Sequence, residues 1–92
     1  MANLFTKNGK PLQVHDIYVY SRSGKFVGHI DGDKVFGPNG RYIGTIDSDR
    51  LIYRSPFKSH VSSPISVANR AGIADAHALA SALWGDEPDI DN

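Results

Sequence analysis

The chain of 92 residues contains no cysteine, no long apolar run and no net charge. The lack of cysteine excludes disulfides, thiolate metal sites and thiol catalysis, and it is typical of an intracellular protein. No stretch approaches the roughly 20 apolar residues that a membrane-spanning helix needs, and the polar start MANLFTKNGK is unlike a signal peptide. We therefore expect one cytoplasmic domain with no membrane partner.

The balance of charge conceals an uneven distribution. Residues 1–60 carry nine Lys or Arg and five Asp, a formal charge of +4, whereas residues 61–92 carry one Arg and five acidic residues, a charge of −4. The simpler expectation is an acidic, disordered tail over residues 86–92. The alternative is that the acidic end binds the basic part of its own chain or of a neighbouring copy.

What the sequence does contain is an internal repeat of sixteen residues. The segment GKFVG at 24–28 is followed by GRYIG at 40–44, and the closing DGDK is followed by DSDR in the same register. A weaker copy starts near Phe5, and a fourth copy starts near Ile52 and then decays. These four copies predict a domain over residues 1–58 that is built from similar stacked or closed units.

Each unit contains the residues of two short strands and two tight turns. The Asn-Gly and Ser-Gly pairs tolerate the positive φ angles of a hairpin turn. A glycine inside a strand, Gly28 in one unit and Gly44 in the next, indicates close backbone approach or a bend. We predict a mainly β fold, an up-and-down meander of about seven short strands in a pseudo-four-fold arrangement that hides its edge strands.

Residues 59–85 follow a different pattern. Ser63 and Pro64 suit the start of a helix, Gly85 suits its end, and alanines recur at helical spacing between them. We predict a linker followed by an Ala-rich helical segment, either one kinked helix or two short helices divided at Gly72. Such a helix would cover the sheet or pair with a second chain.

The cadence VYSRSGKFVGHIDGDKVFGPNGRYIGTIDSDRLIY resembles that of the small bacterial domains called four-fold beta-flower proteins. In these domains short hairpin units repeat about a pseudo-four-fold axis. The resemblance covers roughly residues 3–57 and implies the fold and a bacterial source, but no activity, because the family has no established one. The chain departs from the pattern at both ends. Pro11-Leu12-Gln13 replaces the aromatic–aliphatic–Gly run, and Pro56 replaces the fourth turn glycine.

No residue pattern indicates catalysis, a metal site or a cofactor. The chain lacks a G-x-S-x-G turn, a phosphate-binding loop and the spacing of a catalytic triad, so we expect no enzyme activity. The four histidines lack zinc-ligand spacing, and the paired aspartates at 31/33 and 47/49 suit turn closure better than a calcium loop. His29 is notable because the next unit has Thr45 in its place.

We predict a structural or protein-interaction module that binds itself or another protein. The candidate contact residues are Trp84, Leu83, Ile73 and His29. The alternative is a nucleic-acid-binding module, because basic residues recur beside aromatic ones, a combination that binds single-stranded nucleic acid. The candidate residues for that alternative are Lys25, Lys34, Arg41 and Arg50.

Overall fold

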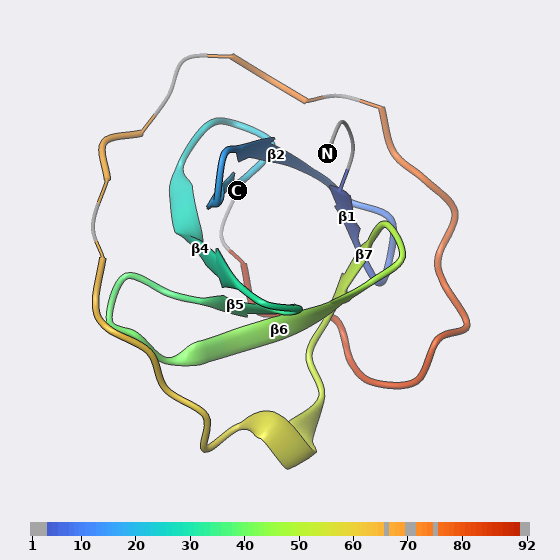
Figure 1. Ribbon diagram of the computed structural model, residues 1–92. Helices are drawn as coiled ribbons and strands as arrows, with labels where there is room; N and C mark the ends of the chain where they lie inside the picture. Colours follow the sequence, from blue (N-terminus) through green and yellow to red (C-terminus); the bar gives the residue numbers. More distant parts are fainter. Residues whose placement is uncertain (1–3, 66, 70–71, 75, 91–92) are drawn as a thin grey trace.

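The computed structural model describes residues 4–65, 67–69, 72–74 and 76–90, and the molecule is a disc with extents of 32 × 32 × 21 Å. Seven strands form a closed barrel in which each strand pairs antiparallel with the next, and β1 pairs parallel with β7 to close it (Figure 1). The elements are β1 (Leu4–Thr6), β2 (Pro11–His15), β3 (Tyr18–Tyr20), β4 (Phe26–Asp31), β5 (Lys34–Phe36), β6 (Tyr42–Asp47), β7 (Arg50–Ile52) and the 3-10 turn η1 (Ser55–Phe57). The predicted β meander is confirmed.

The first three units have the same turn geometry. Their turn glycines have φ angles of +94°, +93° and +80°, as the hairpin prediction requires; they are Gly9, Gly24 and Gly40. Each glycine donates its N–H to the carbonyl three residues earlier, at 2.9 to 3.0 Å. In the fourth unit Pro56 has no N–H to donate, and η1 takes the place of the turn.

One aliphatic residue from each unit forms the centre of the barrel. These four residues are fully buried; they are Leu4, Val19, Val35 and Leu51. Leu12 and Val27 join the same cluster, and Ile43 packs against it partly buried. The four units therefore share one core, as expected of hairpins that cannot bury their faces alone.

Gly28 and Gly44 lie where neighbouring strands approach closely. A Cβ atom at Gly28 would overlap the carbonyl oxygen of Phe36, and one at Gly44 would lie 3.1 Å from the carbonyl oxygen of Ile52. The pairing of each strand with the preceding one also shifts register beside the glycine. Of the two alternatives, close backbone approach or a bend, the structure shows the close approach.

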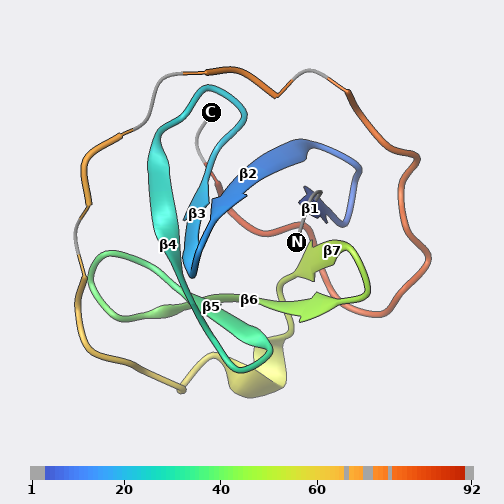
Figure 2. The ribbon, with the colours of Figure 1, turned by 45° about the horizontal axis from the view of Figure 1, so that its top comes forward.

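The segment that was predicted to be helical is instead an extended belt around the barrel. We define the belt as the described residues of 61–87. It leaves η1 and passes around the outside of the strands, as Figures 1 and 2 show, and none of its described residues lies in a helix. The helical prediction is therefore wrong. The described part of the chain holds no helix long and apolar enough to cross a membrane.

The belt is extended because the barrel offers its backbone better partners than a helix would. Ala74, Ala78 and Ser81 donate their N–H groups to carbonyl oxygens of the barrel turns, at 2.7 to 2.9 Å. A helix in this segment would bury only a stripe of small alanine side chains, and most helices depend on such packing for their stability. Gly72, with a φ angle of +118°, adds a conformation that no helix contains.

Residues 86–90, for which we expected disorder, lie against the barrel. Asp86 and Tyr53 exchange two backbone hydrogen bonds, of 2.7 and 2.8 Å. The carboxylate of Glu87 accepts from the Thr6 hydroxyl and from the Asn8 N–H, both at 2.8 Å. The acidic end thus binds its own chain, but the donors to Glu87 are neutral groups rather than basic side chains. Residues 91 and 92 lie outside the described residues.

Candidate binding site

A surface cavity of about 340 Å³ lies between the second and third units. It is formed by the starts of β4 and β6, the turn between β5 and β6, and the end of the described chain. The lining residues are Lys25, Phe26, Val27, Gly37, Pro38, Asn39, Arg41, Tyr42, Ile43, Asp89 and Ile90. Its described charged members are Lys25, Arg41 and Asp89, and they lie beside apolar side chains such as Val27 and Ile43.

The four basic residues of the nucleic-acid alternative separate into two pairs. Lys25 and Arg41 follow equivalent turn glycines, and both line the cavity. Lys34 and Arg50 follow the aspartate turns, and their side chains are only 19% and 14% exposed. The structure therefore brings together one pair at a cavity and uses the other pair in internal contacts.

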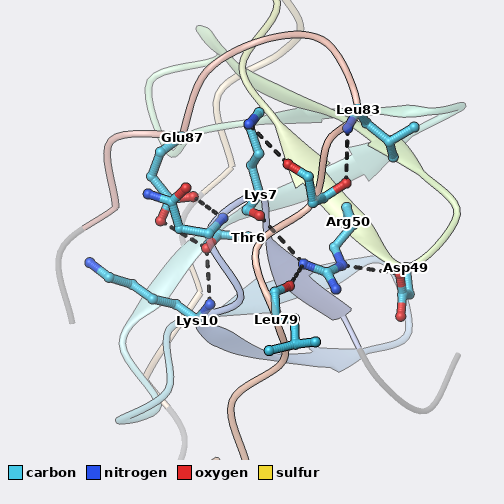
Figure 3. A network of polar contacts seen from close by, with 10 residues as sticks. Thr6, Lys7, Lys10, Asp49, Arg50, Leu79, Leu83 and Glu87 are labelled. Carbon is cyan, nitrogen blue, oxygen red and sulfur yellow. Dashed lines mark hydrogen bonds and ion pairs between the residues drawn. The ribbon is translucent and has the colours of Figure 1, made fainter.

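Arg50 joins β7 to the belt, as Figure 3 shows. Its guanidinium donates to the backbone carbonyl of Leu79, to that of Lys7 at 3.4 Å and to the Asp49 carboxylate at 3.3 Å. In the same network, the Lys7 ammonium donates to the Ser81 carbonyl at 3.0 Å. These contacts position the belt, which is a structural role.

Lys34 makes comparable contacts within the barrel. Its ammonium donates to the Asp33 carboxylate at 3.0 Å and lies 4.4 Å from the centroid of the Phe57 ring. This hydrogen bond is the main cause that holds the pKa of Asp33 below its ordinary value of 3.8. Burial opposes the shift, and the Coulomb attraction of the same ammonium lowers the pKa further.

The aromatic residues that repeat beside the basic ones are packed into the protein. Tyr20 pairs with Phe26 at 5.9 Å between ring centroids, and the equivalent pair of Phe36 with Tyr42 lies at 6.4 Å, both edge to face. All four are at most 8% exposed. Base stacking needs an accessible ring face, so these rings do not provide the platform that the nucleic-acid alternative assumed.

The candidate protein-contact residues lie at different depths. Trp84 and Ile73 are 57% and 69% exposed, and Leu83 is partly buried. His29 is only 4% exposed, and its Nε2 lies 3.2 Å from the Ser62 hydroxyl oxygen. His29 therefore fixes the start of the belt to β4 and is not part of an exposed surface.

Arg54 holds the exposed Trp84 in place. Its guanidinium donates to the Asp47 carboxylate at 2.8 Å and to the Trp84 carbonyl at 3.1 Å, and it lies 4.3 Å from the centroid of the indole ring. Because Arg54 is 7% exposed, one indole face rests on a buried cation while more than half of the side chain faces solvent.

The aspartate turns pair with basic neighbours rather than with one another. Asp33 binds Lys34, Asp49 binds Arg50, and Asp47 binds Arg54. Within the described residues, no group of three or more His, Asp or Glu side chains is placed to hold a metal ion.

Sequence reasoning missed the points at which the belt meets each unit. The belt bonds to the third, second, first and fourth units in turn, through Ser62 with Gly40, Ala74 with Arg22, Ala78 with Gly9 and Asp86 with Tyr53. A Cβ atom at Gly9 or at Gly40 would overlap a carbonyl oxygen of the belt. The turn glycines are thus needed for this contact as well as for the turn. The small residues of the belt were the one feature of the sequence that could have indicated such close contact with the turns.

A closed meander of short strands, assembled from hairpin repeats that share one core, defines the class of protein. The chain belongs to the 4-fold beta flower protein family, whose sequence model matches residues 2–66. The resemblance inferred from the repeat is therefore confirmed. No curated protein and no solved structure matches the chain. The family match covers the whole barrel and ends early in the belt.

Proposed function

We propose that this domain is a small protein-interaction module that self-associates through apolar side chains displayed on its belt. One observation carries the proposal. Of the five large hydrophobic residues exposed in the described part of the chain, four lie on the belt, namely Val61, Ile73, Leu79 and Trp84. Single exposed hydrophobic residues are normal, so the proposal rests on the position that these four share on the outer belt and not on a contiguous apolar patch.

The way in which the belt is attached supports this role. The backbone of the belt binds the barrel, which leaves side chains pointing outward. Leu79 is 87% exposed although its carbonyl accepts a hydrogen bond from Arg50. The carbonyl of Trp84 is likewise bound to Arg54. Burial of such side chains against a second copy would contribute about 25 cal/mol per Å² of apolar surface, and Trp is the residue type most enriched among strong interface contacts.

Light scattering after size-exclusion chromatography, over a wide range of protein concentration, tests the proposal. We expect the wild-type chain to associate at high concentration and the double variant L79S/W84S to dissociate about tenfold more readily. The matched control is Ile17→Ser, which removes an exposed hydrophobic residue from the barrel. A wild-type chain that stays monomeric throughout, or an Ile17→Ser effect as large as that of the double variant, would contradict the proposal.

A further inference from the structure

The first three hairpin units share one backbone hydrogen bond across the base of the turn. A residue at or just after the end of the first strand donates its N–H to the carbonyl oxygen of the basic residue four positions later, at 2.8 Å in each unit. The pairs are Thr6 with Lys10, Ser21 with Lys25 and Gly37 with Arg41. The basic residue directly follows the turn glycine and directly precedes the second strand. This bond therefore marks the place where the second strand of a unit begins.

In the fourth unit the end of the chain makes the same bond. Among the described residues, β7 is followed by no second strand of its own unit. Instead Tyr53 donates its N–H to the carbonyl oxygen of Asp86 at 2.8 Å, and the two residues form an antiparallel bridge although they are 33 positions apart. Asp86 follows Gly85, whose φ angle of +120° is positive like those of the turn glycines. Asp86 thus takes the place of the basic residue, in a contact that backbone atoms make.

The residues after Asp86 continue this equivalence. Two positions after its basic residue, each complete unit has an aliphatic residue in or against the core; these are Leu12, Val27 and Ile43. Two positions after Asp86 lies Pro88, which is buried. Between them the Glu87 carboxylate accepts from the Thr6 hydroxyl and from the Asn8 N–H, both at 2.8 Å (Figure 3). Residues 84–90, which we call the end segment, therefore complete the fourth unit after the belt has passed around the barrel.

The surface that receives the end segment is closely fitted to it. We call this surface the slot and define it by Thr6, Asn8, Ile52, Tyr53 and Arg54. A Cβ atom at Gly85 would overlap the Ile52 side chain and lie 2.8 Å from the Tyr53 carbonyl oxygen. Arg54 donates to the Trp84 carbonyl at 3.1 Å and lies 4.3 Å from the centroid of the indole ring. In sites that accept an added strand, main-chain hydrogen bonds provide affinity and the fit of alternate residues provides specificity.

We propose that the slot is a strand-acceptor site that takes residues 84–90 of a second copy in place of its own end segment. The end segment is joined to the barrel through the belt alone, so the same contacts form equally well between two chains, as in domain swapping. At low protein concentration the segment of the same chain is favoured, because the connection raises its effective concentration. At high concentration the exchange links two barrels. It goes beyond association through the exposed side chains of the belt and does not require it.

The probe is the peptide WGDEPDI, a fluorescein-labelled copy of residues 84–90, followed by fluorescence anisotropy with the full chain. Gly85→Val should empty the slot from within, because the added side chain would meet Ile52 and a positive φ angle does not suit a β-branched residue. A site that is occupied from within binds an external ligand more weakly, by the fraction of molecules in which it is empty. We therefore expect Gly85→Val to bind WGDEPDI about tenfold more tightly than the wild type does.

Two controls accompany this measurement. The peptide WVDEPDI should bind neither chain, because it carries the same obstacle as the variant. Gly32→Val is the matched chain, since Gly32 also has a positive φ angle, of +66°, but a Cβ atom there would meet no other atom within 4 Å. It should bind WGDEPDI as weakly as the wild type does.

NMR of the wild-type chain gives a second test that does not depend on the folding of a variant. Excess WGDEPDI should move the amide signal of Asp86 toward the value of an unstructured peptide, because the end segment leaves the slot. The amide signal of Tyr53 should stay close to its position, because the peptide restores its hydrogen bond.

A pair of complementary variants tests the second copy as the donor of the segment. Tyr53→Pro removes the N–H that donates to Asp86, so it disables the slot and leaves the end segment intact, whereas Gly85→Val does the reverse. In surface plasmon resonance, immobilised Gly85→Val should bind Tyr53→Pro about tenfold more tightly than either variant binds itself. All pairs carry the same exposed belt residues, so association through the belt would appear equally in each of them. Circular dichroism melts establish that both variants are folded.

Three outcomes would overturn the proposal. The first is a Gly85→Val chain that binds WGDEPDI no more tightly than the wild type, with an Asp86 signal that excess peptide does not move. The second is equal binding of WGDEPDI and WVDEPDI, which would show that the fit at Gly85 selects nothing. The third is a mixed pair of variants that binds no more tightly than the pairs of identical variants.

Discussion

The barrel and the belt satisfy their backbone hydrogen bonds in opposite ways. Each barrel strand pairs with the next strand in sequence, and only the closure of β1 on β7 joins distant residues. The backbone hydrogen bonds between the belt and the barrel join residues that are far apart in sequence. The separation ranges from 22 positions, for Ser62 with Gly40, to 74 positions, for Ser81 with Lys7. The barrel is therefore specified by local signals, whereas the belt depends on a surface that exists only after the barrel has closed.

This difference predicts a hierarchy of stability. A substitution that disrupts strand packing removes the surface to which the belt binds, so the barrel and the belt should be lost together. A substitution at the contact between a turn and the belt should release the belt and leave the barrel folded. Cooperative units of unequal stability within one domain are common, and hydrogen exchange resolves them.

Gly28→Ala should have the largest effect. The added Cβ atom would overlap the carbonyl oxygen of Phe36 and lie 2.9 Å from its carbonyl carbon. Because the obstacle is backbone in a paired strand, relief requires movement of β5, and we expect the free energy of unfolding to fall by about 3 kcal/mol. Urea denaturation measures this loss. Circular dichroism and Trp84 fluorescence, which reports on the belt, should change together.

The control for this prediction is Gly32→Ala. Gly32 lies in the turn between β4 and β5, with a φ angle of +66°, and a Cβ atom there would meet no other atom within 4 Å. The free energy of unfolding should therefore fall by about 1 kcal/mol, which is the cost of the left-handed backbone conformation alone. Equal losses in Gly28→Ala and Gly32→Ala would contradict the close approach of β4 and β5.

Gly40→Ala should have an intermediate effect, confined to the belt. Its Cβ atom would overlap the carbonyl oxygen of Ser62, and its φ angle of +80° adds the cost of a left-handed conformation. We expect the free energy of unfolding to fall by about 2 kcal/mol. About half of this loss comes from the left-handed conformation, which Gly32→Ala shares. In hydrogen exchange, the amide of Ser62 should lose protection while β4 to β6 retain theirs. Loss of protection throughout the barrel would show that belt and barrel form one cooperative unit.

The same difference explains how much could be predicted from the sequence. Turn glycines, strand glycines and alternating aliphatic residues determine structure within a few positions of the chain. The meander and the sixteen-residue repeat could therefore be predicted from the sequence. The choice between helix and belt for residues 61–87 was not visible, because Ala and Ser are compatible with both. It depends on the carbonyl groups that Gly9 and Arg22 present on the folded barrel.

For the same reason, only some of the residues that line the cavity could be grouped from the sequence. Lys25 and Arg41 occupy equivalent positions in adjacent units, and the repeat was enough to group them. The arrival of Asp89 and Ile90 at the same place required the path of the belt. His29 shows the converse error, because a side chain that breaks the repeat was taken as a candidate contact and instead lies buried beside Ser62.

Asp33→Asn should have the smallest effect on the free energy of unfolding. The dependence of stability on pH distinguishes this effect from the others. Lys34 holds the pKa of Asp33 below 3.8, so the folded protein binds this proton less readily than the unfolded chain does. The stabilising contribution is therefore fully present above pH 3.8 and is lost as the pH falls through the lowered pKa of the folded state. The Asp33 side chain is 65% exposed, so solvent screening limits this contribution to about 0.3 kcal/mol.

Urea denaturation at neutral and at strongly acidic pH should show Asp33→Asn less stable than the wild type only at neutral pH. Lys34→Met is the complementary variant, because the ammonium also lies 4.4 Å from the Phe57 ring centroid, a contact that does not depend on the protonation of Asp33. It should be destabilising at both pH values, and more so at neutral pH. Since Lys34 bonds within the barrel, hydrogen exchange of the belt should be unchanged in both variants. A change in the hydrogen exchange of the belt would mean that the loss of even a weak contact within the barrel destabilises the belt.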